Sequence, residues 1–148
     1  KEYGTLPFVS CSPVQLNQVF LNLLSNAIDA LKSQTHNNQK EIRLQTRAIA
    51  DNTVEITIED NGPGIHPEIL DKIFDPFFTT KPVGQGTGLG LATSHEIIKN
   101  HQGKITVSSW VGEGTTLTIT LPVKLLNSPT PLPAHHDPSH SPIQSLLR

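Results

Sequence analysis

The sequence lacks several features that would place it in other classes of protein. Its 148 residues include no Met, a single Cys and a single Trp. The lone Cys11 cannot form an internal disulfide and has no cysteine partner at metal-ligand spacing. No apolar run approaches the ~20 residues that span a bilayer, and no charged-then-apolar leader opens the chain. We therefore expect a cytoplasmic fragment without membrane contact of its own, and the Lys at position 1 suggests that further chain precedes it.

Charge and composition divide the chain into two parts. Eleven basic and thirteen acidic residues give a net charge of −2, and no basic stripe supports nucleic-acid binding. After about Asn127 the chain holds five of its twelve prolines and three of its seven histidines. That stretch has little apolar area to offset the entropy of ordering, and nothing fixes its histidines for a metal. We expect one globular domain over residues 1–124 and a disordered tail or linker over residues 125–148.

A long amphipathic helix opens the globular part. Ser12-Pro13 predicts its start, with a Ser cap and Pro at the first helical position. A three- and four-residue repeat then predicts a helix to about Gln34 with a buried stripe. The residues of that stripe are Leu16, Val19, Phe20, Leu23, Leu24, Ala27, Ile28 and Leu31.

Alternating strands and a second helix complete the expected fold. Strands are predicted around 42–48, 54–58, 105–107 and 117–121, with a turn at Asp51-Asn52. A short helical piece is expected over 67–73. A second helix over about 88–101 should bury Leu91, Ala92, Ile97 and Ile98 and end at Gly103 as its cap. Hairpins dominate over βαβ units, so we expect a mixed, largely antiparallel sheet with helices on one face.

The first helix also carries a polar stripe beside its apolar one. Its members are spaced three or four residues apart and would share a face: Gln15, Gln18, Asn22, Asn26 and Asp29. A solvated face is the common interpretation of such a stripe. Here, however, it contains poor helix formers and no cation before Lys32. Amide oxygens are hard ligands that suit Mg²⁺, so Asn22 and Asn26 form a candidate metal site.

The second candidate is Asp60, at the end of the second long strand. It has the same parity as the inward-facing Val54, Ile56 and Ile58, and a carboxylate that faces inward needs a partner. One interpretation is a turn in which Asp60 caps its own backbone. The other is an acceptor for a ligand donor such as an adenine amino group, with Gly62 and Gly64 leaving room for a flat ring.

Two loops in the middle of the chain follow. Four alternating glycines in the run Gly84–Leu91 lead directly into a helix, an arrangement that suits an anion. The run matches neither the phosphate loop nor the dinucleotide fingerprint. Before it, Ile73–Lys81 gathers three of the five Phe. These aromatics either pin a loop to the core or act as a lid, and Lys81 would then bring a cation to a phosphate. The loop Gly112–Thr115 suggests only a hairpin.

Taken in order, these motifs resemble the ATP-binding catalytic domain of sensor histidine kinases. NLLSNAIDA resembles the asparagine box, DNGPG and GTGLGL the two glycine boxes, and IFDPFFTTK the phenylalanine box. GEGTTLTITLP resembles the closing glycine box and strand. The match covers roughly residues 5–123. It implies a Bergerat-type α+β two-layer sandwich with about five strands and about three helices. This superfamily also includes DNA gyrase, the heat-shock chaperone ATPase and the mismatch-repair ATPase.

The resemblance also implies roles for individual residues. Asn26, assisted by Asn22, would hold Mg²⁺ and form the catalytic pair, and Asp60 would accept the adenine amino proton. The remaining ATP-binding residues would be Asp29, Gly62, Gly64, Ile65, Phe74, Lys81, Gly86, Thr87, Gly88, Leu89, Gly90, Leu91 and Thr115. Hydrolysing relatives carry a Glu where this chain has Asn22, and an amide is no general base. Many histidine kinases carry a Lys where this chain has Asp29, so we expect Lys81 to supply the missing phosphate contact.

The expected function is therefore phosphoryl transfer from Mg-ATP to a His on a dimerisation domain outside this fragment. The fragment alone would be inactive, and a response regulator would act downstream. His95 reads as an ordinary helix residue, because no acceptor pattern surrounds it. An ATPase of the same fold and a nucleotide-sensing module without catalysis are the competing interpretations. Steady-state phosphate release would favour the former, and ATP binding without transfer the latter.

Overall fold

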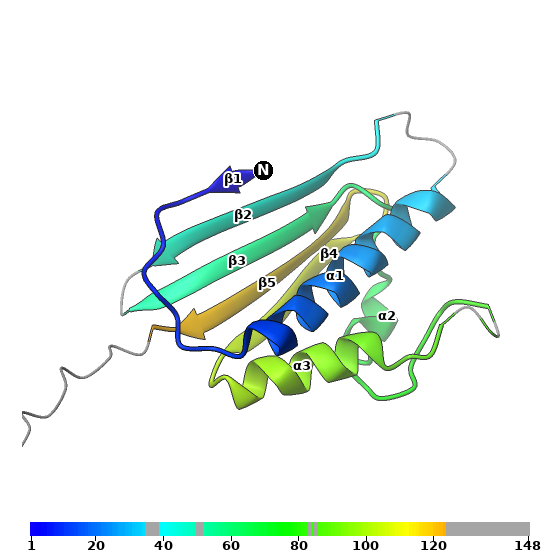
Figure 1. The fold of residues 1–148 in the computed structure, drawn as a ribbon. Coiled ribbons are helices and arrows are strands. Elements are labelled where there is room, and N and C mark those ends of the chain that lie inside the picture. Colours follow the sequence, from blue (N-terminus) through cyan, green and yellow to red (C-terminus); the bar gives the residue numbers. More distant parts are fainter. Residues whose placement is uncertain (35–38, 50–51, 83, 85, 124–148) are drawn as a thin grey trace, which may run out of the picture.

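The computed structural model describes residues 1–34, 39–49, 52–82, 84 and 86–123, which form two layers (Figure 1). One layer is a five-stranded sheet in the order β1-β2-β3-β5-β4. β1 runs parallel to β2, and the other pairings are antiparallel. The strands are β1 (Glu2–Tyr3), β2 (Ile42–Ile49), β3 (Thr53–Asp60), β4 (Lys104–Trp110) and β5 (Gly114–Pro122). The mixed, largely antiparallel sheet that the sequence predicts is confirmed, and β1 is the strand that its pattern missed.

The second layer consists of α1 (Pro13–Ser33), the one-turn α2 (Pro67–Leu70) and α3 (Gly90–Asn100). Figure 1 shows α1 and α3 side by side across one face of the sheet, with α2 at the end where β3 finishes. The α1 stripe buries Leu16, Val19, Leu23, Ala27 and Leu31 as predicted. Ile28 is 45% exposed, so its predicted burial is wrong. It follows the buried Ala27 by one residue and so lies about 100° around the helix from it, off the buried stripe.

The core lies between the two layers. α1 and α3 contribute the fully buried Val19, Leu23 and Ile98, and the inward faces of β3 and β5 contribute Ile58 and Ile119. Every second residue of β3 is buried, as expected for a strand with one covered face. The opposite face is polar, with ion pairs such as Arg47–Glu55 at 2.6 Å.

The predicted start of α1 at Ser12-Pro13 is confirmed, but its side-chain cap and both predicted ends of α3 differ from the structure. Ser12 precedes α1 but makes no side-chain cap bond, and its backbone N–H instead donates to His101 Nε2 at 3.0 Å. α3 begins at Gly90, because Gly88 has φ +66° and cannot be helical. Gln102, rather than Gly103, takes the left-handed conformation after α3. It donates to the Lys99 carbonyl while Gly103 donates to the Ile98 carbonyl, which is a Schellman motif.

Several expectations lie partly or wholly outside the described residues. The tail, with its three histidines, is one of them, and Asp51 of the predicted turn is another. Asn52 of the same turn is described and has φ 53°. In the described part of the chain, no helix combines the length and apolarity needed to cross a bilayer.

Candidate functional site

Asp60 ends β3 with its side chain turned toward the core, where it is only 8% exposed. Oδ1 accepts the backbone N–H of Gly62 at 2.9 Å, and the backbone N–H of Thr115 donates to the same carboxyl. Asp60 therefore both caps the backbone of its own turn and presents a buried carboxylate, so the two interpretations drawn from the sequence are compatible. Burial raises the pKa of Asp60 above its ordinary value, while these two donors partly offset the rise.

A polar row extends from Asp60 across three strands. Thr115 of β5 lies opposite both Asp60 and Ser109 in the sheet register. The Ser109 hydroxyl donates to the Gly114 carbonyl at 2.8 Å and lies 3.0 Å from Thr115 Oγ1. Because Ser109 has one proton, Thr115 is the donor between the two hydroxyls. The inward apolar faces of β3, β5 and β4 thus all end in hydroxyl or carboxyl groups at one end of the sheet.

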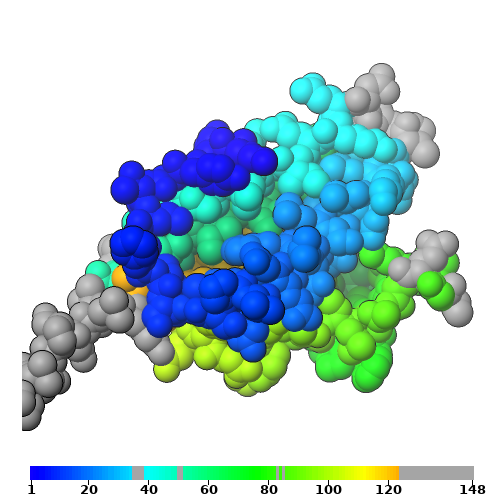
Figure 2. Space-filling view, viewed as in Figure 1, coloured from blue at the N-terminus to red at the C-terminus, as the bar shows by residue number. Residues whose placement is uncertain are grey.

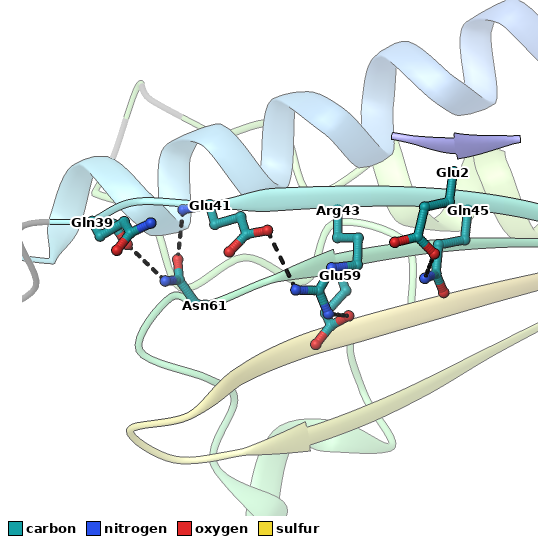
Figure 3. Close-up of polar contacts among 7 residues, drawn as sticks. All are labelled: Glu2, Gln39, Glu41, Arg43, Gln45, Glu59 and Asn61. Atoms are coloured by element: carbon teal, nitrogen blue, oxygen red, sulfur yellow. Dashed lines mark hydrogen bonds and ion pairs between the residues drawn. The ribbon is translucent and has the colours of Figure 1, made fainter.

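The loop that follows Asp60 is fixed from both sides. The Ser109 hydroxyl accepts the backbone N–H of Ile65 at 2.8 Å. On the other side, Asn61 Oδ1 accepts the Glu41 N–H and Asn61 Nδ2 donates to the Gln39 carbonyl, each at 2.8 Å (Figure 3). Sequence reasoning missed both anchors. The parity of Ser109 with Ile105 and Val107 could have identified it, whereas nothing local distinguished Asn61.

Two glycines of this loop are required because neighbouring atoms leave no room for a Cβ. A Cβ at Gly62 would lie 2.6 Å from Asp60 Oδ1, and one at Gly64 would lie 2.1 Å from the Trp110 carbonyl oxygen. Gly64 also has φ +73°. Packing against Asp60 and the β4–β5 hairpin therefore explains both residues, whether or not a flat ligand lies beside them.

The polar stripe of α1 faces the start of α3. Asn22 Nδ2 donates to the Gly90 carbonyl at 3.1 Å and to Ser94 Oγ at 3.3 Å. Since a carbonyl only accepts, this bond fixes the amide nitrogen toward α3 and leaves Asn22 Oδ1 as an acceptor. Asn26 lies half-buried one turn further on, and its carboxamide makes no hydrogen bond to any residue that the structure describes.

The glycine-rich segment leads into α3 without a side-chain cap on the helix. Thr87 Oγ1 accepts the Leu89 N–H at 3.3 Å, and Gly88 accepts a bond from the Phe77 N–H at 2.9 Å. The uncapped N-terminus with its dipole is suited to an anion. It faces Asn22, so the two predicted phosphate-end motifs lie together. Leu91 is half-buried and packs on the core.

The aromatic loop divides between core and surface. Phe74 packs on the core, and its ring centroid lies 5.3 Å from that of His95 on α3. Phe77 is 75% exposed, with φ 68°. His95 is an exposed residue of α3, as expected from the sequence, and its ring lies beside Phe74 of the loop. Figure 2 shows the surface hollowed between the second half of α1 and the green segment that precedes α3.

Lys81 reaches across to α1. Its Nζ lies 2.7 Å from Asp29 Oδ2, and Lys32 Nζ lies 3.3 Å from Asp29 Oδ1. The hydrogen bond from Lys81 is the main cause that lowers the pKa of Asp29 below its ordinary value. Gly86 lies against the same lysine, because a Cβ there would be 3.1 Å from Lys81 Cβ. The Lys81 side chain therefore contacts both Asp29 on the α1 stripe and Gly86 in the glycine-rich segment.

A metal at this site would depend on amide oxygens. No group of three His, Cys, Asp or Glu side chains in the described part of the chain could hold an ion. Two amide acceptors on α1 face this site, Asn22 Oδ1 and the carboxamide of Asn26, which has no hydrogen-bond partner among the described residues. Both are hard oxygen ligands and fit Mg²⁺ that keeps most of its waters and binds phosphate. The arrangement offers a buried acceptor at one end and anion-binding groups at the other.

Comparison with known proteins identifies the class that this fold and site define. Residues 11–125 match the family described as histidine kinase-, DNA gyrase B-, and HSP90-like ATPase, and the chain belongs to that family. It is an ATP-binding catalytic domain of the kind found in two-component sensor histidine kinases.

Particular relatives agree with this placement. The chain is 50% identical over 108 residues to the signal transduction histidine-protein kinase AtoS of Escherichia coli, covering 73% of this chain and 17% of AtoS. It is 44% identical over 110 residues to the two-component sensor PprA of Pseudomonas aeruginosa, covering 74% of this chain and 12% of PprA. The chain therefore spans less than a fifth of the length of these two relatives.

Solved structures show the same fold. The nucleotide-free catalytic domain of the histidine kinase ThkA superposes with a TM-score of 0.65 at 34% identity, covering 78% of this chain and 70% of that one. The mycobacterial sensor histidine kinase MprB superposes with a TM-score of 0.68 at 28% identity, covering 82% and 79%. The two-layer α+β sandwich expected from the sequence is confirmed.

Proposed function

We propose that this domain binds Mg-ATP and donates the γ-phosphoryl group to a histidine on a dimerisation domain outside the chain. In that transfer, the bond from the γ-phosphorus to its bridging oxygen breaks and a phosphorus–nitrogen bond to the imidazole forms. A response regulator would then accept the phosphoryl group, and the setting would be cytoplasmic. The observation that carries the proposal is the Asn22–Gly90 hydrogen bond, which brings the α1 stripe to the N-terminus of α3.

Different residues would bind the two ends of the nucleotide. Asp60 and Thr115 would bind the adenine, with Gly62, Gly64 and Ile65 forming the adjoining loop. Asn22 and Asn26 would hold Mg²⁺, which supplies charge neutralisation of the phosphates when bound. Lys81 and the backbone of Gly86–Leu91 would bind phosphate oxygens. Phe74 would steady the loop between the two ends through its contact with α3.

Transfer rather than hydrolysis follows from the chemistry of Asn22. Orienting and activating a water for attack calls for a general base, and a carboxamide does not accept a proton near neutral pH. Its nitrogen is also committed to the Gly90 carbonyl, a position where a carboxylate oxygen would be repelled. The domain would then accelerate transfer by positioning and charge stabilisation. Alone, without an acceptor histidine, it should turn over little ATP.

The test joins this domain to a histidine-bearing dimerisation segment and supplies ATP labelled at the γ-phosphate. The proposal expects acid-labile label on the dimerisation segment, lost in Asn26→Ala. Asn22→Gln keeps an amide but moves it by one methylene, so transfer should fall without any gain in hydrolysis. Steady phosphate release by the domain alone would instead favour the ATPase. ATP binding with no transfer would favour the nucleotide-sensing module.

A further inference from the structure

The ion pair between Asp29 and Lys81 joins two parts of the chain that are 52 residues apart. Lys81 Nζ and Asp29 Oδ2 are 2.7 Å apart, and each side chain is about one-third exposed, at 34% and 36%. Water therefore reaches both groups. A partly solvated pair of this kind is weak enough to exchange partners when a stronger anion arrives.

Asp29 is an unexpected charge at this position. It lies one helical turn beyond Asn26 on the polar stripe of α1, so its carboxylate faces the region assigned to the phosphates. Uncompensated, it would repel them. Two lysines compensate its charge, and they differ in exposure and in where they come from in the chain. Lys32 is an i+3 neighbour on the same helix with a side chain that is 74% exposed, whereas Lys81 comes from the loop that borders the glycine-rich segment.

Lys81 lies close enough to that segment to serve it. A Cβ at Gly86 would lie 3.1 Å from Lys81 Cβ and 3.2 Å from Lys81 Cδ, so the lysine stem runs along the Gly86 backbone. An ammonium on a flexible four-carbon stem can turn from a carboxylate to a phosphate without moving that stem far. Lys32 would remain at Oδ1 and keep Asp29 partly neutralised.

We propose that Asp29 holds Lys81 when the site is empty and that the triphosphate takes Lys81 over from Asp29. Asp29 is then a positioning residue that competes with nucleotide for one cation and so sets the affinity for ATP. This inference rests on the proposed function, because it needs a phosphate at the Lys81 end of the site.

The test titrates Mg-ATP and, separately, adenosine into the parent and into Asp29→Asn, Lys81→Ala and the double variant. Removing the competitor in Asp29→Asn should tighten ATP binding about two- to fivefold. Removing the cation in Lys81→Ala should weaken it at least about tenfold, the loss expected for a charge-assisted hydrogen bond. With Lys81 absent, Asp29→Asn should tighten ATP binding less than it does in the parent, because only the direct repulsion that Lys32 partly neutralises then remains to be relieved.

The controls separate this inference from the proposed function. Lys32→Ala removes the other cation of the same carboxylate, which makes no proposed phosphate contact, and should weaken ATP binding less than Lys81→Ala does. Adenosine affinity should stay constant in all variants, since adenosine has no phosphate. Weakened or unchanged ATP binding in Asp29→Asn would overturn the exchange, as would equal tightening without Lys81. If the folded parent binds neither ATP nor adenosine, the proposed function itself fails, and the exchange fails with it.

Discussion

Ser109 shows how a single hydroxyl can organise a site that it need not touch. It accepts from Ile65, donates to the Gly114 carbonyl and accepts from Thr115, so one side chain links the loop after β3 to the β4–β5 hairpin. Asp60 sits at the centre of these elements, in register with Thr115. The geometry of the buried carboxylate therefore depends on a neighbour two strands away.

Replacing Ser109 by Ala should destabilise the domain by about 1–3 kcal/mol, because the Ile65 N–H and the Gly114 carbonyl lose their partner. Denaturant unfolding measures this loss. Ser108→Ala is the matched control, since Ser108 is exposed on the outer face of the same strand and should change stability by less than about 0.5 kcal/mol. Equal effects of the two substitutions would contradict the anchoring role.

Asp60 and Asp29 should respond to pH with opposite signs. Burial raises the pKa of Asp60, so its contribution to stability is full below the unfolded-state pKa and is lost as pH rises through the folded-state pKa. Lys81 lowers the pKa of Asp29, whose contribution is present above the unfolded-state pKa and is lost as pH falls through the folded-state pKa.

Urea unfolding of the parent, Asp60→Asn and Asp29→Asn over about pH 3 to 7 measures both effects. The stability difference, parent minus variant, should fall with rising pH for Asp60→Asn and rise for Asp29→Asn. A flat difference for Asp60→Asn would show that its carboxyl is not desolvated as the structure has it.

At the scale of elements, the aromatic loop and the glycine-rich segment are joined backbone to backbone. The Phe77 N–H donates to the Gly88 carbonyl at 2.9 Å, and a Cβ at Gly88 would lie 2.3 Å from the Phe77 carbonyl carbon. Gly88 also has φ +66°. Two constraints, conformation and space, therefore require glycine immediately before α3, and they set where that helix begins.

Gly88→Ala should lower stability by more than the about 1–2 kcal/mol that a left-handed backbone costs any residue with a Cβ. Gly112→Ala separates the two constraints, because Gly112 has φ +87° and nothing within 4 Å of the Cβ position. Thermal unfolding of both variants gives the comparison. If Gly88→Ala loses no more stability than Gly112→Ala, the contact with Phe77 is not what fixes the glycine.

Regular periodicity was predictable from the sequence, and pairwise contacts were not. The α1 stripe and the alternation of β3 follow from local spacing, and so do the two strands of the closing hairpin. β1 is two residues long, too short to carry a pattern of its own, and its partners in β2 lie 43 residues away along the chain. The cap at Gln102 was missed because glycine at the next position is the commoner helix stop.

In the candidate site, too, some residues were predictable from local sequence and others were not. Asn22, Asp60 and the glycine-rich run were identified from residue type, spacing and parity, all of which are local properties. Asn61 and Ser109 were missed because their roles are defined by hydrogen bonds across 22 and 44 residues of sequence. The Asp29–Lys81 pair is intermediate. Both residues were singled out separately, but only the fold shows that they contact each other.

For the whole molecule, the two halves of the site come from opposite layers. The polar row at the end of β3, β5 and β4 supplies the buried carboxyl, the polar stripe of α1 supplies amides, and α3 supplies an uncapped helix start. Under the proposed function, the nucleotide would place its adenine at the buried carboxyl and its phosphates at the amides and the helix start. This division predicts which substitution affects which end of the nucleotide.

The most direct test is a calorimetric titration of ATP into the domain, with Mg²⁺ and with EDTA, for the parent, Asn26→Ala and Asp60→Ala. We expect the parent to bind ATP more weakly in EDTA and Asn26→Ala to lose this dependence on Mg²⁺. Asp60→Ala should weaken ATP and adenosine alike, whereas Asn26→Ala should leave adenosine unchanged. No heat from a folded parent, or equal binding by all three proteins, would contradict a nucleotide site built from these two ends.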